Sequence, residues 1–306
     1  MDKTNGKQFN IIGLGEVLFD ILPSKQKMLG GAPANFAYIS TQLGNQGVVL
    51  SRVGNDEAGQ EILEQLKGKN LSTENIQLDQ RHQTGMVNVA LSEGQPTYQI
   101  VEHVAWDFIE LEESWRAIAK NADAICFGSL AQRSEIARKT VLEVIGLTKG
   151  LRILDVNLRQ NYFTAEILRQ SFRLANIVKL NQEELQVIAK IFNIKSENDI
   201  ETAEKLREKF DLQLICVTCG ANGSLLVKAN EFSVNAGLKI QVKDVIGAGD
   251  AFTAALTHGL LRGWDLNKTN EFANKIGAFV ASQTGAMPDF TEFQFIITEF
   301  EKATAV

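Results

Sequence analysis

In residues 124–157, AICFGSLAQRSEIARKTVLEVIGLTKGLRILDVN, two short apolar runs flank one amphipathic segment. The runs Ala124–Phe127 and Arg152–Asn157 are short and have apolar centres, as expected of strands that are buried on both faces. Between them, Ser134–Thr148 repeats apolar residues at helical spacing. A helix that connects two such strands makes them parallel, so this unit predicts an α/β protein.

The same alternation continues on both sides of this unit. Further buried strands are predicted at Phe9–Leu14, Val48–Val53, Ile177–Leu180 and Leu212–Thr218. Amphipathic segments predict helices at Ala32–Leu43, Ala58–Lys67 and Thr202–Phe210. This order of strands and helices predicts a doubly wound, mostly parallel sheet, which binds ligands at the carboxyl ends of its strands.

One region departs from the α/β alternation. Gly85–Leu91 and Thr97–Val104 alternate apolar and polar positions, and the turn-forming residues 92–96 join them, which predicts a β-hairpin. The segment Glu16–Met28 is predicted to add strands, so that residues of about 16–28 and 85–107 form a small β-sheet. Such a sheet suits a lid over a ligand, or an edge through which two subunits pair as a homodimer. Because no linker interrupts the chain, residues 1–306 are predicted to form a single domain that carries this lid.

The composition excludes several classes of function. The formal net charge of −6 argues against a nucleic-acid partner, because phosphate neutralisation requires clustered Lys and Arg. No apolar run reaches the roughly 18 residues that a membrane span needs, and the first ten residues are too polar for a signal peptide. The 3 cysteines suggest no disulfide framework. These features predict a cytoplasmic protein that binds neither nucleic acid nor membrane.

The strongest local motif is DVIGAGD, residues 244–250, which precedes a predicted helix at Ala251–Leu261. Its glycines would place free backbone N–H groups at the helix N-terminus, where they and the helix dipole bind anionic oxygens. A carboxylate beside a bound phosphate is chemically sensible if Asp250 takes the proton of an incoming hydroxyl group during phosphoryl transfer. The alternative is that Asp250 only caps the helix, and the motif alone does not decide between the two.

A second motif is GGAPANFA, residues 30–37, which opens a predicted helix. Its paired glycines let the backbone approach a ligand closely, and Pro33 suits a first helical turn. Asn35 would direct an amide, both donor and acceptor, toward a ligand at the helix start, as binding of a polyol requires. The alternative is an ordinary glycine turn before a helix.

Together the two motifs resemble the N-terminal and C-terminal signatures of the PfkB, or ribokinase-like, family of carbohydrate kinases. Gly44 and Gly54 continue the first signature at the family's spacing, and Asp244–Leu256 reproduces the second. The resemblance extends from Gly15 to about Phe290, and the predicted alternation and β lid match the family fold. It implies a ribokinase-like fold, ATP and Mg²⁺ as cofactors, and transfer of the γ-phosphate to a hydroxyl group of a small sugar.

The resemblance also implies roles for individual residues. Asp250 is similar to the family's general base, and the backbone amides of its anion hole correspond to Gly247, Ala248 and Gly249. The implied sugar-binding residues are Asp20, Gly30, Gly31 and Asn35.

The nucleotide and metal sites follow from the same resemblance. Asn181-Gln182-Glu183-Glu184 matches the family's N-x-x-E motif, in which Asn181 and Glu184 organise Mg²⁺ and phosphate through water. These four residues equally fit a helix capping box, and both roles are compatible. Asp244 and the loop Ser282–Met287 resemble the monovalent-cation site, usually of K⁺, although Val245 stands where the family usually has Thr. The further ATP-binding residues that the resemblance implies are Thr218, Gly220, Gly223 and Asn274.

The residues around the sugar site are most similar to those of bacterial fructokinases, in particular GGAPAN and FGSLAQR, residues 127–133. Asp20 favours a neutral substrate, because a carboxylate would repel a sugar phosphate. Arg133 and Arg159 follow predicted strands and are expected to reach the substrate. They could bind a carboxylate, as in the similar 2-keto-3-deoxygluconate kinases, or pair with ATP phosphates and local acids. Fructose is the predicted substrate, with the keto acid or the substrate of another sugar or nucleoside kinase of the family as alternatives.

The sequence argues against two functions from other classes. Gly13-Leu14-Gly15 suggests a dinucleotide-binding oxidoreductase, but Leu18 stands where the third glycine of that motif belongs. A catalytically silent sugar-binding protein could use the same fold, but it would not need an intact Asp250 and glycine motif.

Overall fold

The computed structural model describes residues 7–92 and 95–302, and its centre is a nine-stranded sheet in the order β13-β12-β11-β10-β9-β8-β1-β4-β5. The strands from β5 to β11 run parallel, whereas β12 and β13 form an antiparallel hairpin at one edge. The predicted mostly parallel sheet is confirmed. The strand bounds are β1 (Asn10–Leu14), β4 (Gln46–Gly54), β5 (Ile76–Asp79), β8 (Ala124–Gly128), β9 (Leu151–Asp155), β10 (Ile177–Asn181), β11 (Leu214–Thr218), β12 (Ser224–Lys228) and β13 (Glu231–Asn235).

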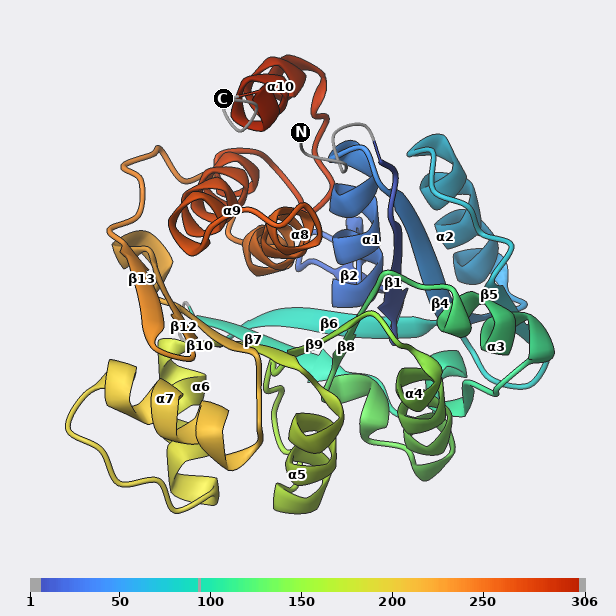
Figure 1. Ribbon diagram of the computed structural model, residues 1–306. Helices are drawn as coiled ribbons and strands as arrows, with labels where there is room; N and C mark the ends of the chain where they lie inside the picture. The colour runs from blue at the N-terminus through green and yellow to red at the C-terminus, as the bar shows by residue number, and fades with distance from the viewer. Residues whose placement is uncertain (1–6, 93–94, 303–306) are drawn as a thin grey trace.

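Helices cover both faces of this sheet, with α1, α2, α8 and α9 on one side and α4 to α7 on the other (Figure 1). Neighbouring strand residues alternate between two hydrophobic clusters: Ile153 packs toward α1 and α8, and Leu154 packs toward the opposite helices. Two-sided burial explains the continuous apolar runs in the sequence. The helix bounds are α1 (Ala32–Gln42), α2 (Glu57–Gly68), α3 (Glu113–Lys120), α4 (Glu135–Leu147), α5 (Ala165–Leu174), α6 (Gln182–Ile191), α7 (Asp199–Lys209), α8 (Ala248–Leu261), α9 (Leu266–Ala281) and α10 (Gln294–Lys302).

A separate four-stranded sheet has the order β3-β2-β6-β7, with β2 (Leu18–Ile21), β3 (Lys27–Gly30), β6 (Gly85–Ser92) and β7 (Gln95–Ile100). It consists of two antiparallel hairpins joined by the parallel pair β2 and β6. The predicted small β-sheet is therefore present and uses both expected segments. Through β2 it is continuous with the loop that leaves β1.

The strand order creates a topological switch between β1 and β8. From β1 the chain proceeds to β4 and β5 on one side, then returns to β8 on the other side of β1. Helix α1 packs directly against β1 at this switch. A side chain at Gly13 would overlap the backbone carbonyl oxygen of Pro33, so glycine is needed for this close approach. In sheets of this kind the crevice at the carboxyl ends of such strands is the usual ligand site.

Among the described residues, no helix has both the length and the hydrophobicity that crossing a membrane would require.

Candidate active site

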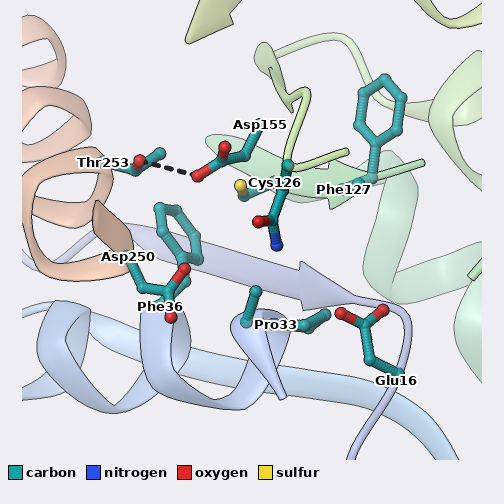
Figure 2. A pocket seen from close by; sticks show the side chains of 11 residues that line it. Glu16, Pro33, Phe36, Cys126, Phe127, Asp155, Asp250 and Thr253 are labelled. Carbon is teal, nitrogen blue, oxygen red and sulfur yellow. Dashed lines mark hydrogen bonds between the residues drawn. The ribbon is translucent and has the colours of Figure 1, made fainter. Parts of the chain in front are cut away.

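A pocket lies at the switch between β1 and β8 (Figure 2). The loop after β1, the first turns of α1 and α8, and the carboxyl ends of β8 and β9 all contribute to it. Its wall combines apolar side chains with three acids, Glu16, Asp155 and Asp250. Such a mixture of an apolar wall and a few converging polar groups is typical of a small-molecule site.

The glycine motif 247–249 forms the N-terminus of α8. Gly247 adopts a left-handed conformation, with φ of 78°, and a Cβ atom there would lie 2.5 Å from the Cβ atom of Ala286. Only glycine fits this position without strain. The first backbone N–H groups of a helix lack partners within the helix, so the turn Gly247–Gly249 has donors suited to anionic oxygens, and its contact with a phosphate stays a prediction.

Asp250 lies in the first turn of α8, and its carboxylate contacts the other signature motif. Its Oδ2 accepts a hydrogen bond of 2.8 Å from Nδ2 of Asn35. The N-cap of α8 is Gly247, and no side chain caps this helix end, so the alternative of Asp250 as a mere cap is not supported. Asn35 donates this bond through its amide nitrogen, while its own Oδ1 is buried and has no partner among the described residues, and its contact with a sugar stays a prediction.

The electrostatic surroundings of Asp250 suit a general base. Burial raises the pKa of its carboxyl group to about 6, and the negative charge of Asp155 adds to this increase. The hydrogen bond from Asn35 and the positive charges of Lys179 and Arg159 act in the opposite direction. The carboxylate form therefore prevails at pH 7, with a basicity higher than that of an ordinary aspartate.

A buried ion pair supports the floor of this region. Nζ of Lys179, on β10, lies 3.1 Å from both carboxylate oxygens of Asp155, its partner in register on β9. Asp155 also accepts a hydrogen bond of 3.1 Å from the hydroxyl group of Thr253 on α8, drawn in Figure 2. Lys179 in turn lies against the glycine motif, since a Cβ atom on Gly249 would be 3.1 Å from its Nζ. The pair thus connects two central strands to the start of α8.

The expected sugar-binding residues of the lid lie together. A Cβ atom on Gly30 would be 2.7 Å from Oδ2 of Asp20, so glycine at this position leaves room for the carboxylate on the adjacent strand. Burial raises the pKa of Asp20 to about 6, and the charge of Arg159 opposes this. Gly31, with φ of 109°, forms the N-cap of α1 and touches the backbone of Glu16.

The two arginines have different surroundings. Arg133 forms a buried, bidentate ion pair with Asp107, at 2.7 and 2.8 Å, and stacks on Trp106. It therefore fixes the segment that follows β7. Its Nη1 is buried without a hydrogen-bond partner among the described residues, and a contact of Arg133 with the substrate stays a prediction. Arg159 is exposed, and its guanidinium group donates a hydrogen bond to the carbonyl oxygen of Leu158. Its positive charge acts to lower the pKa values of Glu16 and Asp20.

The N-x-x-E motif forms the capping box that its sequence allows. Oδ1 of Asn181 accepts a hydrogen bond from the backbone of Glu184, and Oε2 of Glu184 accepts one from the backbone of Asn181, both of 2.8 Å. Oε1 of Glu184 also accepts from the backbone of Leu158, at 2.7 Å. Each carboxylate oxygen keeps a further lone pair, so this arrangement remains compatible with a water-mediated metal contact.

The predicted nucleotide turn joins β11 to β12, the first strand of the edge hairpin. Gly220 and Gly223 both have positive φ, and a side chain at Gly223 would overlap the carbonyl oxygen of Asn235. Asn274 is buried and donates to Ser224, at 2.7 Å, which ties α9 to β12. Thr218 ends β11 directly before this turn. Their contacts with ATP stay a prediction.

Asp244 connects the two loops of the expected cation site. Its Oδ1 accepts a hydrogen bond from the backbone of Ile246, and its Oδ2 accepts one from Gly285 in the second loop. The residues that the structure describes contain no cluster of three His, Cys, Asp or Glu side chains suited to a metal ion.

The sequence interpretation missed three charged residues of this region, Glu16, Asp155 and Lys179. Glu16 was assigned only to the lid segment, and the other two lie inside apolar strands. A charged residue within an otherwise apolar strand is a signal that could have identified Lys179 and Asp155.

Comparison with known proteins matches one family over most of the chain. The family model described as pfkB family carbohydrate kinase matches residues 21–292. The uncharacterized sugar kinase PH1459 of Pyrococcus horikoshii is 32% identical over 297 residues, covering 90% of this chain and 91% of the relative. Its structure in complex with ATP superposes with a TM-score of 0.82 over 95% of this chain and 99% of that one.

Two further relatives act on different substrates. A fructokinase of Escherichia coli is 28% identical, covering 90% of this chain and 94% of the relative. An ATP-dependent 6-phosphofructokinase of Thermoanaerobacterium thermosaccharolyticum is also 28% identical, covering 96% of this chain and 95% of the relative. Sequence identity therefore does not distinguish a free sugar from a sugar phosphate as the substrate of this chain.

Proposed function

The chain belongs to the PfkB family of carbohydrate kinases, and we propose that the sugar it phosphorylates with ATP is a neutral, free ketohexose, fructose above all. The observation that carries this proposal is the charge of the pocket. Its lining residues in the described part of the chain include three acids and no lysine or arginine. Asp20 adds a fourth carboxyl group from the lid. The charge of Asp155 is balanced by Lys179. Asp250 and Asp20 therefore supply the negative charge that would repel a phosphate or carboxylate on the sugar.

The proposed mechanism assigns the proton transfer to Asp250. Its carboxylate, oriented by Asn35, takes the proton of the sugar hydroxyl group as the hydroxyl oxygen bonds to the γ-phosphorus atom and ADP departs. The amides of Gly247, Ala248 and Gly249 stabilise the negative charge that develops on the transferred group. Asp20 and Gly31 are proposed to position the sugar, and Arg159 to approach it from the rim of the pocket.

The nucleotide is proposed to bind along the glycine-rich turns. Thr218, Gly220 and Gly223 would contact ATP, and Asn181 and Glu184 would bind Mg²⁺ through water. When bound, Mg²⁺ neutralises charge on the phosphate oxygens. We further propose a monovalent cation beside Asp244, a cytoplasmic location, and pairing of two copies through an edge strand of the lid.

The substrate proposal predicts a marked preference for an uncharged sugar. In a coupled ADP-release assay, kcat/KM for fructose should exceed that for 2-keto-3-deoxygluconate and for fructose 6-phosphate by about tenfold or more, because like charges disfavour the wrong substrate. Ribose and adenosine complete the panel. A higher kcat/KM for either anionic sugar, lost on Arg159→Ala, would overturn the fructose assignment and leave the kinase assignment intact.

A further inference from the structure

Glu16 occupies a position in the pocket that the mechanism above does not use. It lies in the turn between β1 and β2, after Gly15, and its side chain lines the pocket. Figure 2 shows Glu16 and Asp250 toward opposite ends of the pocket, with Pro33 between them. A substrate that presents one hydroxyl group to Asp250 would therefore extend toward Glu16.

The backbone holds Glu16 firmly in this place. A side chain at Gly31 would overlap the backbone carbonyl oxygen of Glu16, so the start of α1 packs directly on this turn. Glu16 is only 4% exposed. Its carboxyl group consequently cannot turn outward to water as an ordinary surface glutamate does.

One oxygen of this carboxyl group lacks a partner. Oε2 of Glu16 is buried and makes no hydrogen bond with any described residue. Buried polar atoms are nearly always paired, and leaving one unpaired costs about 1–3 kcal/mol. An unpaired oxygen in the wall of a ligand pocket indicates that the ligand supplies the missing partner.

The surroundings favour the protonated form of this group. Burial raises the pKa of Glu16 to about 7, and the negative charge of Asp250 on α8 contributes. A hydrogen bond from the backbone N–H of Glu16 itself opposes this most, followed by the charges of Arg159, after β9, and Arg133, after β8. A protonated carboxyl group can donate a hydrogen bond, which a carboxylate cannot.

We infer that Glu16 binds the sugar as a carboxylic acid, donating a hydrogen bond to a sugar oxygen, and that it helps to select the substrate. This inference rests on the proposed sugar kinase function and extends it. It gives the two carboxyl groups of the pocket opposite states, since Asp250 must lose its proton to act as a base while Glu16 must keep its own.

The inference predicts a narrow, bell-shaped dependence of kcat/KM for fructose on pH. Activity should rise with pH as Asp250 loses its proton near pKa 6, and should fall at higher pH as Glu16 loses its own near pKa 7. Because the two groups interact, the two apparent values belong to the pair. The profile is measured for the wild type, Glu16→Gln and Glu16→Leu between about pH 5 and pH 9.

The two variants separate hydrogen bonding from mere packing. Glutamine still donates but does not titrate, so Glu16→Gln should abolish the alkaline fall while lowering the maximal kcat/KM by no more than about tenfold. Leucine cannot donate, so Glu16→Leu should lower kcat/KM by about 10- to 100-fold, mainly through KM for the sugar and with little change in KM for ATP. Calorimetric titration of the ADP-bound enzymes with the sugar at both pH extremes measures the same differences in sugar affinity without phosphoryl transfer.

The results that would overturn the inference are an alkaline fall that persists in Glu16→Gln, or a sugar affinity in Glu16→Leu equal to that of the wild type. An error in the proposed substrate gives a different result, because the wild type itself would then fail to turn over fructose. In that case the profiles are recorded with the sugar of the panel that the wild type phosphorylates, and the same two criteria apply.

Discussion

Asp250→Asn is expected to lower kcat by about 10²–10⁴, the usual loss when a positioned general base is removed. The asparagine keeps the size of the side chain, and its carbonyl oxygen can still accept the hydrogen bond that Asn35 donates to Oδ2 of Asp250 at 2.8 Å. It cannot, however, take a proton from the sugar hydroxyl group. Sugar affinity and melting temperature should therefore change far less than kcat.

Three measurements on this variant test the role of the carboxylate. They are kcat with saturating fructose and ATP, the sugar Kd in the presence of ADP, and the melting temperature. The rise of wild-type kcat/KM through pH 6 should also be absent from the residual activity, because the group with the raised pKa is gone. Turnover close to that of the wild type would remove Asp250 from the mechanism.

The fold was predictable because both faces of the large sheet are buried. Such strands must be continuously apolar, and the run Leu212–Thr218 accordingly differs from β11 only at its start. The helix predicted from Ala251 begins at Ala248 instead, because Gly247 takes a left-handed conformation and lets the helix start earlier. The sequence of the motif did not show which of its two glycines would adopt the left-handed conformation.

The site was predictable only where its residues lie in continuous motifs. Asn35 and Asp250 were both identified, but the hydrogen bond between them joins residues 215 positions apart and depends on how α1 packs against α8. Glu16 lies in the turn after β1, Asp155 at the end of β9 and Lys179 within β10, and only the strand order brings these three elements together. The ion pair of Arg133 could not be predicted, because its partner, Asp107, lies in a different part of the sequence, after β7.

Lys179→Met is expected to lower the free energy of unfolding by about 3–5 kcal/mol, which is typical when one member of a buried ion pair is removed. Both residues are buried, and Nζ of Lys179 lies 3.1 Å from each oxygen of Asp155. Burial alone would lower the pKa of the lysine, but the charges of Asp155, Glu184 and Asp250 outweigh it and hold the pKa above its usual value. The ammonium is therefore present in neutral solution, and its removal leaves a buried carboxylate without a counter-charge.

Denaturant unfolding of two matched variants isolates this effect. Lys205 forms an exposed ion pair with Glu201 that is shorter, at 2.6 Å, but Lys205→Met should cost far less stability than Lys179→Met because solvent screens that pair. The double variant Asp155→Asn, Lys179→Met should recover about 2 kcal/mol or more, since no charge then remains unpaired. Because Lys179 also lies against Gly249, kcat should fall together with stability and recover only in part in the double variant. A loss of stability in Lys179→Met no larger than in Lys205→Met would show that the buried pair does not hold the start of α8 in place.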